Sequence, residues 1–228
     1  MTQFLATARA LRASRHGIVY AAPRRLRRRE VALTFDDGPS EWTPRVLDLL
    51  GDAGARGTFF VLGCAVAGRE EIVRRTAAEG HEVANHAYTH LDPGVLPDDA
   101  LRGELEQTNA VLEAVCGCRP RYFRPPYAGT DFRVADVARS AGFERTVLRS
   151  VDPIDWNESD ADVIAGRVLG QIRPGSIVCL HDALPPREPV GVPTREPTVA
   201  ALARIVPELV RRNFRCVTVT ELLAWNPR

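Results

Sequence analysis

The chain contains no lysine, and all 30 of its basic residues are arginine. We attribute this to codon bias in a GC-rich genome, so it carries no functional argument. The sequence also lacks any apolar run close to the roughly 20 residues of a transmembrane helix, and it therefore predicts no membrane span. Its longest basic run, RRLRRR at residues 24–29, is short and contains no aromatic residue. We therefore expect no nucleic acid partner.

Cysteine is scarce and lacks the CxxC spacing of metal-binding motifs. The five cysteines form an odd set: Cys64, Cys116, Cys118, Cys179 and Cys216. Cys116 and Cys118 stand too close in sequence for an easy mutual disulfide. The amino-terminal residues lack the uninterrupted apolar core of a secretion signal, because Arg9, Arg12 and Arg15 break every candidate stretch. These absences favour reduced thiols and a cytoplasmic location.

Acidic residues are absent from the first 29 positions, which hold eight arginines, whereas residues 30–228 hold 22 arginines and 29 acidic residues. We therefore divide the chain into an arginine-rich N-terminal extension at residues 1–30 and one domain at residues 31–228, a usual length for a single α/β barrel. We interpret the extension as a solvated or packed helical segment. Peripheral contact with an anionic membrane surface, or contact with an acidic partner, is the alternative. The sequence predicts no oligomeric state.

Short apolar runs alternate with amphipathic segments along the domain. The runs that predict strands are 31–35, 57–62, 81–84, 121–123, 145–150, 176–180 and 215–219. The segments that predict helices are 43–53, 65–79, 98–115, 131–141, 160–171 and 198–212. This alternation predicts a single-domain α/β fold with about seven parallel strands. The five prolines of residues 182–197 predict a long surface loop after the sixth strand.

Polar side chains follow most of these predicted strands. In chain order they are Asp36 and Asp37, then His86 and His90, then Arg124 and Tyr127, then Asp152, Asp155 and Trp156, and finally His181. Each group alone fits turn chemistry or a core histidine. Catalytic groups of parallel α/β folds, however, gather at the carboxyl ends of the strands. The shared position therefore indicates one site, whereas we interpret His16 and His81 as structural.

The two acids at the end of the first strand raise a geometric question, because neighbouring strand residues point to opposite faces. Asp36 and Asp37 can share a site only where the strand stops, and Gly38 followed by proline provides that stop. His86 and His90 are four residues apart, a spacing that on a helical turn brings both imidazoles to one metal ion. Two histidines and one aspartate form an open three-ligand site, as in catalytic zinc centres and in non-haem iron enzymes.

The five segments, in this order, resemble the five motifs of the polysaccharide deacetylase family, carbohydrate esterase family four. LTFDDGP, EGHEVANH and VDPIDW resemble its NodB-type chitooligosaccharide deacetylase branch in particular. The resemblance covers residues 31–223 approximately. It implies a distorted (β/α) barrel and one divalent metal ion, in most cases Zn²⁺, with Co²⁺, Ni²⁺ or Mn²⁺ as alternatives.

By motif position, the resemblance implies that Asp37, His86 and His90 bind this metal ion. It also implies that Asp36 is the general base and that Arg124 holds it in place. A buried carboxylate pair independently requires a compensating cation, which agrees with an arginine at this position.

The remaining implied roles concern protonation of the leaving group and binding of the substrate. The resemblance implies that His181 is the general acid, with Asp155 behind it. The backbone N–H of Tyr127 would help to hold the oxyanion. Trp156 would form a wall of the acetyl pocket, and Pro126 belongs to the same substrate-binding set.

Two positions depart from the family pattern. Ala87 stands where the family usually has serine or threonine, so a hydrogen bond in the loop is expected to be missing. Cys179 stands where the last motif usually has leucine, which changes the shape expected for the acetate pocket but not the chemistry.

The resemblance implies an N-acetylated sugar as substrate and a metal-dependent hydrolysis as the reaction. The N-acetyl group would come from oligosaccharides or glycoconjugates that contain N-acetylglucosamine, and the products would be acetate and a free amine. A natural-product glycoside intermediate or peptidoglycan is the alternative substrate. A non-haem iron enzyme and an inactive sugar-binding module are the alternatives outside hydrolysis.

Overall fold

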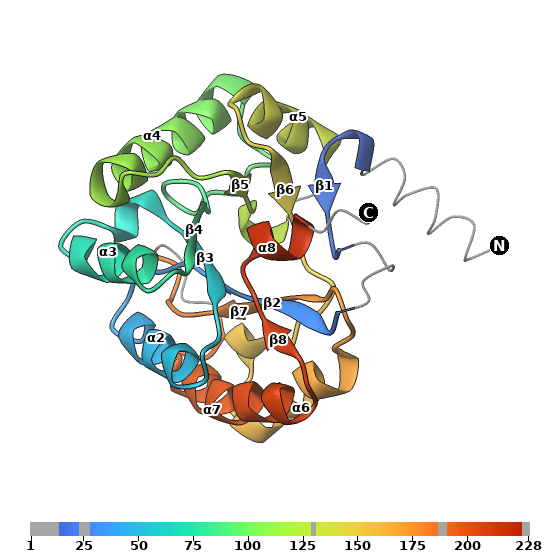
Figure 1. Ribbon diagram of the computed structural model, residues 1–228. Helices are drawn as coiled ribbons and strands as arrows, with labels where there is room; N and C mark the ends of the chain where they lie inside the picture. Colours follow the sequence, from blue (N-terminus) through green and yellow to red (C-terminus); the bar gives the residue numbers. More distant parts are fainter. Residues whose placement is uncertain (1–13, 23–27, 129–130, 187–190, 225–228) are drawn as a thin grey trace.

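The computed structural model describes residues 14–22, 28–128, 131–186 and 191–224. In this part, a curled sheet of parallel strands forms the centre, and helices surround it (Figure 1). The strands are β1 (Ile18–Val19), β2 (Glu30–Asp36), β3 (Gly57–Val61), β4 (Glu82–Asn85), β5 (Tyr122–Phe123), β6 (Arg145–Val147), β7 (Ile177–His181) and β8 (Arg215–Cys216). Their order is β1-β6-β5-β4-β3-β2-β7, and β8 pairs with β2. The predicted distorted barrel is confirmed.

Six helices pack one apolar face on the outside of this sheet. They are α2 (Thr43–Asp52), α3 (Glu70–Ala78), α4 (Asp98–Cys116), α5 (Phe132–Ser140), α6 (Ala161–Gln171) and α7 (Glu196–Arg211). The short helix α8 (Val219–Leu223) instead contributes Val219 and Leu222 to the interior of the barrel. Helix α2 shows the principle: Pro44 lies in its first turn, and its buried positions Val46, Leu47 and Leu50 recur at helical spacing. Such faces bury the helix-facing side of the sheet and leave the barrel interior to a separate set of residues.

Strand β2 lies between β3 and β7, and all seven of its residues are buried. Val31, Leu33 and Phe35 belong to the large core cluster shared with the helices. Ala32 belongs instead to the interior cluster. Because side chains alternate between faces, Asp36 continues the interior face of Ala32 and ends it with a carboxylate.

Residues of the predicted extension take part in the barrel. Ile18 and Val19 pair with Thr146 and Val147 of β6. Ala21 forms an isolated bridge to Ser176, immediately before β7. The structure therefore places these extension residues against the sheet, while the domain boundary at residue 30 stays a prediction. Residues 1–13 and 23–27, which hold most of the arginines of the extension, lie outside the described residues.

Several predicted elements differ in extent from the observed ones. The helix predicted at 65–79 is a short 3-10 turn, η1 (Gly63–Ala65), followed by α3, because Gly68 has a φ of 77° that interrupts a helix. The strand predicted at 215–219 ends at Cys216 and gives way to α8. Thr218 and Glu221 form a reciprocal capping box at the start of α8. Among the described residues, no helix combines the length and the apolar character needed to cross a bilayer.

Candidate active site

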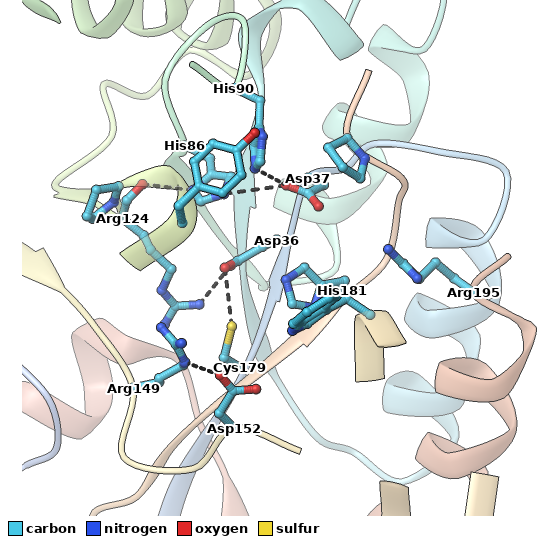
Figure 2. A pocket seen from close by; sticks show the side chains of 14 residues that line it. Asp36, Asp37, His86, His90, Arg124, Arg149, Asp152, Cys179, His181 and Arg195 are labelled. Carbon is cyan, nitrogen blue, oxygen red and sulfur yellow. Dashed lines mark hydrogen bonds and ion pairs between the residues drawn. The ribbon is translucent and has the colours of Figure 1, made fainter. Parts of the chain in front are cut away.

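A cavity opens at the carboxyl ends of the central strands (Figure 2). Its lining residues are Asp36, Asp37, His86, His90, Arg124, Pro125, Tyr127, Arg149, Asp152, Trp156, Cys179, His181, Pro185 and Arg195. The structure thus brings together every site residue predicted from the sequence except Asp155 and Pro126. Asp155 lies behind His181, as expected, and Pro125 lines the cavity in place of its neighbour Pro126.

The backbone explains how two adjacent acids reach one cavity. β2 ends at Asp36, and Asp37 has a φ of 77°, which turns its side chain out of the strand alternation. Gly38 follows, and a Cβ atom there would lie 2.5 Å from the Asp182 carboxylate, so any other residue would have to displace this buried side chain. The turn that ends β2 is therefore also what allows both carboxylates to face one cavity.

Asp36 is a buried carboxylate held by a buried arginine. The Arg124 guanidinium donates from NH1 to Asp36 Oδ1 at 2.7 Å and to Thr34 Oγ1 at 2.7 Å. Its other nitrogens donate to the carbonyl oxygens of Val147 and Leu148. Burial alone would raise the pKa of Asp36, but the charges of Arg124, His86 and His181 together outweigh it and hold this pKa below its ordinary value. Asp36 is therefore ionised and fixed in orientation.

Asp37 faces the two predicted ligand histidines. Its Oδ1 lies 3.4 Å from Nε2 of His86 and 3.2 Å from Nε2 of His90. This buried oxygen makes no hydrogen bond of ordinary geometry to any residue that the structure describes. Burial would raise the pKa of Asp37, but the interactions with both imidazoles outweigh it and lower this pKa far below its usual range. An ionised carboxylate and two imidazole nitrogens, all buried and converging, fit a divalent metal ion.

The surroundings of His86 also favour a role as a metal ligand. Its Nδ1 donates to the backbone carbonyl of Arg124 at 2.7 Å, which leaves the Nε2 lone pair for a metal ion.

The histidine pair lies in a loop, so the expected helical turn is wrong. Positive φ values of 67° at Ala87 and 60° at His90 shape this loop. Glu104 of α4 holds it by accepting hydrogen bonds from the backbone of residues 88 and 89.

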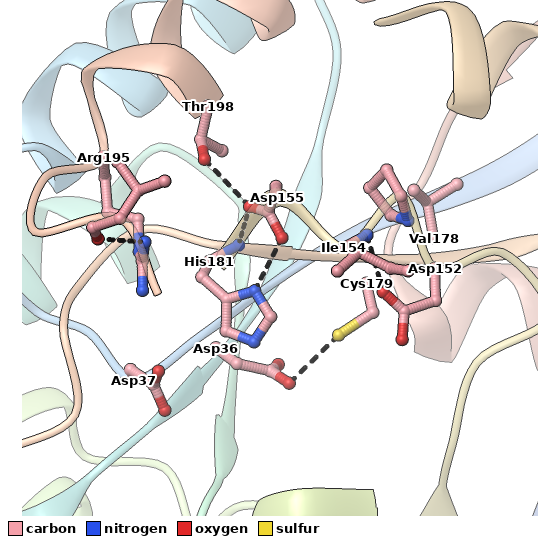
Figure 3. Close-up of polar contacts among 12 residues, drawn as sticks. Asp36, Asp37, Asp152, Ile154, Asp155, Val178, Cys179, His181, Arg195 and Thr198 are labelled. Atoms are coloured by element: carbon pink, nitrogen blue, oxygen red, sulfur yellow. Dashed lines mark hydrogen bonds and ion pairs between the residues drawn. The ribbon is translucent and has the colours of Figure 1, made fainter. Parts of the chain in front are cut away.

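His181 and Asp36 meet because their strands are neighbours in register, with Asp36 opposite His181. The His181 Nδ1 donates to Asp155 Oδ1 at 2.8 Å, and the His181 backbone N–H donates to Oδ2 at 2.8 Å (Figure 3). Thr198 adds a third hydrogen bond to Asp155. Burial would lower the pKa of His181, but Asp155, helped by the charges of Asp37 and Asp36, outweighs it and raises this pKa to about 9. His181 is therefore protonated near neutral pH.

Tyr127 and Trp156 stand at the rim of the cavity. Tyr127 has a φ of 56° and an exposed ring, whose centroid lies 4.7 Å from that of His90. Trp156 is half-buried, and its backbone carbonyl accepts a hydrogen bond from the backbone N–H of Val192 at 2.9 Å. The segment after His181 is therefore tied to the rim.

That segment is only partly the surface loop that was predicted. No helix or strand is found at residues 182–186 or 191–195, but α7 already begins at Glu196. Arg195 is fully buried and donates from Nε to the carbonyl of Ala183 at 2.8 Å. Residues 187–190 lie outside the described part of the chain.

Arg149 and Arg195 are cavity residues that the sequence reasoning missed. Arg149 donates to Asp152 at 2.6 Å beside the Cys179 thiol. The NH2 group of Arg195 is buried and makes no hydrogen bond to the described residues. An arginine in a chain with 30 arginines carries no distinguishing sequence signal. Only the three-dimensional arrangement shows these two in the cavity.

Comparison with known proteins agrees with this architecture. The family model for polysaccharide deacetylase matches residues 24–146, which include Asp36, Asp37, His86, His90 and Arg124. A chitooligosaccharide deacetylase of Bradyrhizobium sp. (strain ANU 289) is 41% identical over 199 residues, which are 85% of this chain and 90% of that protein. A peptidoglycan-N-acetylglucosamine deacetylase of Bacillus cereus is 38% identical over 198 residues, covering 86% and 88% of the two chains.

Comparison with solved structures finds members of the same family. The crystal structure of the Bc1960 peptidoglycan N-acetylglucosamine deacetylase superimposes with a TM-score of 0.83 at 34% identity, and the match covers 93% of this chain and 95% of that one. The family also includes BA3943 of Bacillus anthracis, described as a pseudoenzyme, with a TM-score of 0.79 at 29% identity over 90% of this chain and 68% of that one. The chain belongs to the polysaccharide deacetylase family, carbohydrate esterase family four.

Proposed function

We propose that this protein hydrolyses the N-acetyl group of N-acetylglucosamine units in oligosaccharides or glycoconjugates, in a metal-dependent reaction. The observation that carries the proposal is the geometry around β2. An ionised carboxylate, Asp36, and a protonated imidazole, His181, lie opposite each other in register, immediately beside a His–His–Asp ligand set. A sugar-binding module has no use for a base and an acid placed beside such a set.

Asp37, His86 and His90 would hold the metal ion, and Zn²⁺ suits two imidazoles and one carboxylate. Bound there, it would lower the pKa of water and polarise the amide carbonyl. The second ring nitrogen of His86 is already occupied by the carbonyl of Arg124, so this ligand is oriented in advance.

The proton transfers would belong to the side chains on either side of the scissile bond. Asp36 accepts a proton from the attacking water, and Arg124 fixes its orientation during the transfer. His181 donates a proton to the departing nitrogen, which leaves as a neutral amine, while Asp155 holds the imidazole in place. The backbone N–H of Tyr127 would stabilise the oxyanion.

The substrate class rests on the relatives, which act on chitooligosaccharides and on peptidoglycan N-acetylglucosamine according to their names. The test is a panel of N-acetylglucosamine oligomers, glycoside conjugates and peptidoglycan fragments, with acetate and free amine measured together. We expect equal amounts of both products from at least one member. Oxygen consumption instead of acetate release would favour an iron enzyme, and binding without release would favour a sugar-binding module.

The segment after His181 should influence which substrate is preferred. Pro185 lines the cavity, and the backbone of Val192 bonds to that of Trp156, so the segment forms part of the rim. Replacing residues 184–190 with a Gly/Ser linker of equal length keeps Ala183 and Arg195, which are buried. The ratio of kcat/KM between members of the panel should then change by roughly tenfold, about 1.4 kcal/mol, which alters their ranking. Acetate should still be released.

A linker of the same composition at residues 92–96, in the loop after His90, provides the comparison for this experiment. If the 184–190 variant ranks the panel as the wild type does, and the 92–96 variant does not, selectivity lies in the loop after His90.

A further inference from the structure

A second group of metal-ligating side chains lies beside the His–His–Asp set. It consists of Asp36, Cys179 and His181, whose ligand atoms all lie within 4.8 Å of one another. All three line the same cavity. The proposed reaction uses the carboxylate and the imidazole and leaves the thiol without a role. This thiol is also a departure from the family pattern, which usually has leucine at this position.

The strand geometry brings these three side chains together. Asp36 and His181 are neighbours in register, and Cys179 precedes His181 by two residues, so it lies on the same face of β7. The Cys179 thiol donates to Asp36 Oδ2 with a distance of 3.3 Å. Ligand atoms of a tetrahedral zinc ion are about 3.3–3.8 Å apart, given bond lengths of 2.0–2.3 Å. The sulfur and the carboxylate oxygen therefore already have nearly the spacing of two zinc ligands.

His181 has the arrangement of a metal-binding imidazole. Its Nδ1 is taken by Asp155, and the opposite edge of its ring faces Asp36 and Cys179 (Figure 3). Histidine ligands typically donate the second ring N–H to a carboxylate, which orients the ring and raises its basicity. The hydrogen bond to Asp155 can therefore orient His181 as a metal ligand as well as it orients His181 as a general acid.

We propose that a second zinc ion binds Asp36, Cys179 and His181 and inhibits the enzyme. The thiol proton passes to solvent as the zinc–sulfur bond forms, and the proton on the ring nitrogen of His181 that faces the cavity leaves in the same way. Inhibition rests on the proposed function: neither the base nor the acid can transfer a proton while its lone pair is bound to zinc. A soft thiolate ligand selects zinc over magnesium or manganese.

The second site should be weaker than the first. The Arg124 guanidinium lies 2.7 Å from Asp36 Oδ1 and repels a cation placed beside this carboxylate. By contrast, Asp37 is faced by two imidazoles that can both become ligands. The His–His–Asp set therefore fills first, and inhibition begins only beyond one equivalent of zinc.

The test is a titration of the metal-free protein with Co²⁺ and with Zn²⁺, using Cys179→Leu, Cys179→Ser and the control Cys118→Ser. Cys118 is an exposed cysteine and does not line the cavity. We expect a near-ultraviolet thiolate-to-cobalt charge-transfer band with the second equivalent in the wild type and in Cys118→Ser. Both Cys179 variants should lack this band and bind one zinc ion in place of two.

Activity then tests the inhibitory role. Each protein is compared with itself at one equivalent of zinc, and the zinc concentration that halves activity should rise at least tenfold in both Cys179 variants. A wild type that binds one ion and shows no charge-transfer band would overturn the site. Equal inhibition of the wild type and both Cys179 variants would overturn its role. The band and the stoichiometry need no substrate, so they decide the site even if no deacetylation is found.

Discussion

Asp36→Asn should keep one metal ion per chain and lose kcat by roughly 10²–10⁴, the usual contribution of a general base. Asp37→Asn should lose metal affinity before anything else. The reason lies in the different partners of the two carboxylates. Asp37 Oδ1 faces the Nε2 atoms of both His86 and His90, whereas Asp36 is bonded to Arg124 and opposes His181. Elemental analysis and kcat on one substrate separate the two effects.

Asp48→Asn is the matched control for this pair, because Asp48 lies on the exposed side of α2 and pairs with Arg75 away from the cavity. It should change neither metal content nor kcat. Asp36→Asn leaves a buried arginine with a weaker partner, so a thermal unfolding curve must accompany each rate. An Asp36→Asn protein that is folded but empty, beside a metal-loaded Asp37→Asn, would show that the two roles are reversed.

Asp155→Asn should lower kcat by roughly 10²–10⁴ as well, although Asp155 does not line the cavity. Its carboxylate accepts two hydrogen bonds from His181, one from the ring and one from the backbone, and its charge keeps the imidazole protonated. An amide keeps much of the shape but removes the charge. Asp155 therefore acts as a positioning residue whose loss weakens the acid.

The pH profile distinguishes this role from a general loss of structure. Burial lowers the pKa of His181, and Asp155, with smaller contributions from Asp37 and Asp36, raises it to about 9, so removing the Asp155 charge lets this pKa fall. A general acid works only when protonated, and activity is lost as pH rises through its pKa. The basic limb of the kcat/KM profile should therefore move to lower pH in Asp155→Asn. A lower rate with an unmoved basic limb would contradict the assignment of His181 as the acid.

The structure brings the predicted site residues into one cavity because they lie at strand ends. Asp36, Arg124 and His181 each follow a short apolar run, and parallel strands bring such positions to one edge. The order of the strands was not readable from the runs. The opposition of Asp36 and His181 depends on β2 pairing with β7, a contact between residues more than 140 positions apart.

Other features escaped prediction because tertiary contacts decide them. Ile18 and Val19 form a strand of two residues that exists only through its pairing with β6. His86 and His90 converge through positive φ values in a loop that Glu104 holds from another element. By contrast, α8 carried a local signal, Thr218 followed three residues later by Glu221, which the sequence reasoning overlooked.

Acetate release before and after metal removal tests the central claim most directly. The protein is dialysed against a chelator until elemental analysis finds no metal, and it is then assayed alone and with one equivalent of Zn²⁺ or Co²⁺ on a substrate of the native protein. Metal-dependent deacetylation predicts that activity disappears with the metal and returns with one equivalent. Full acetate release by the metal-free protein would contradict it.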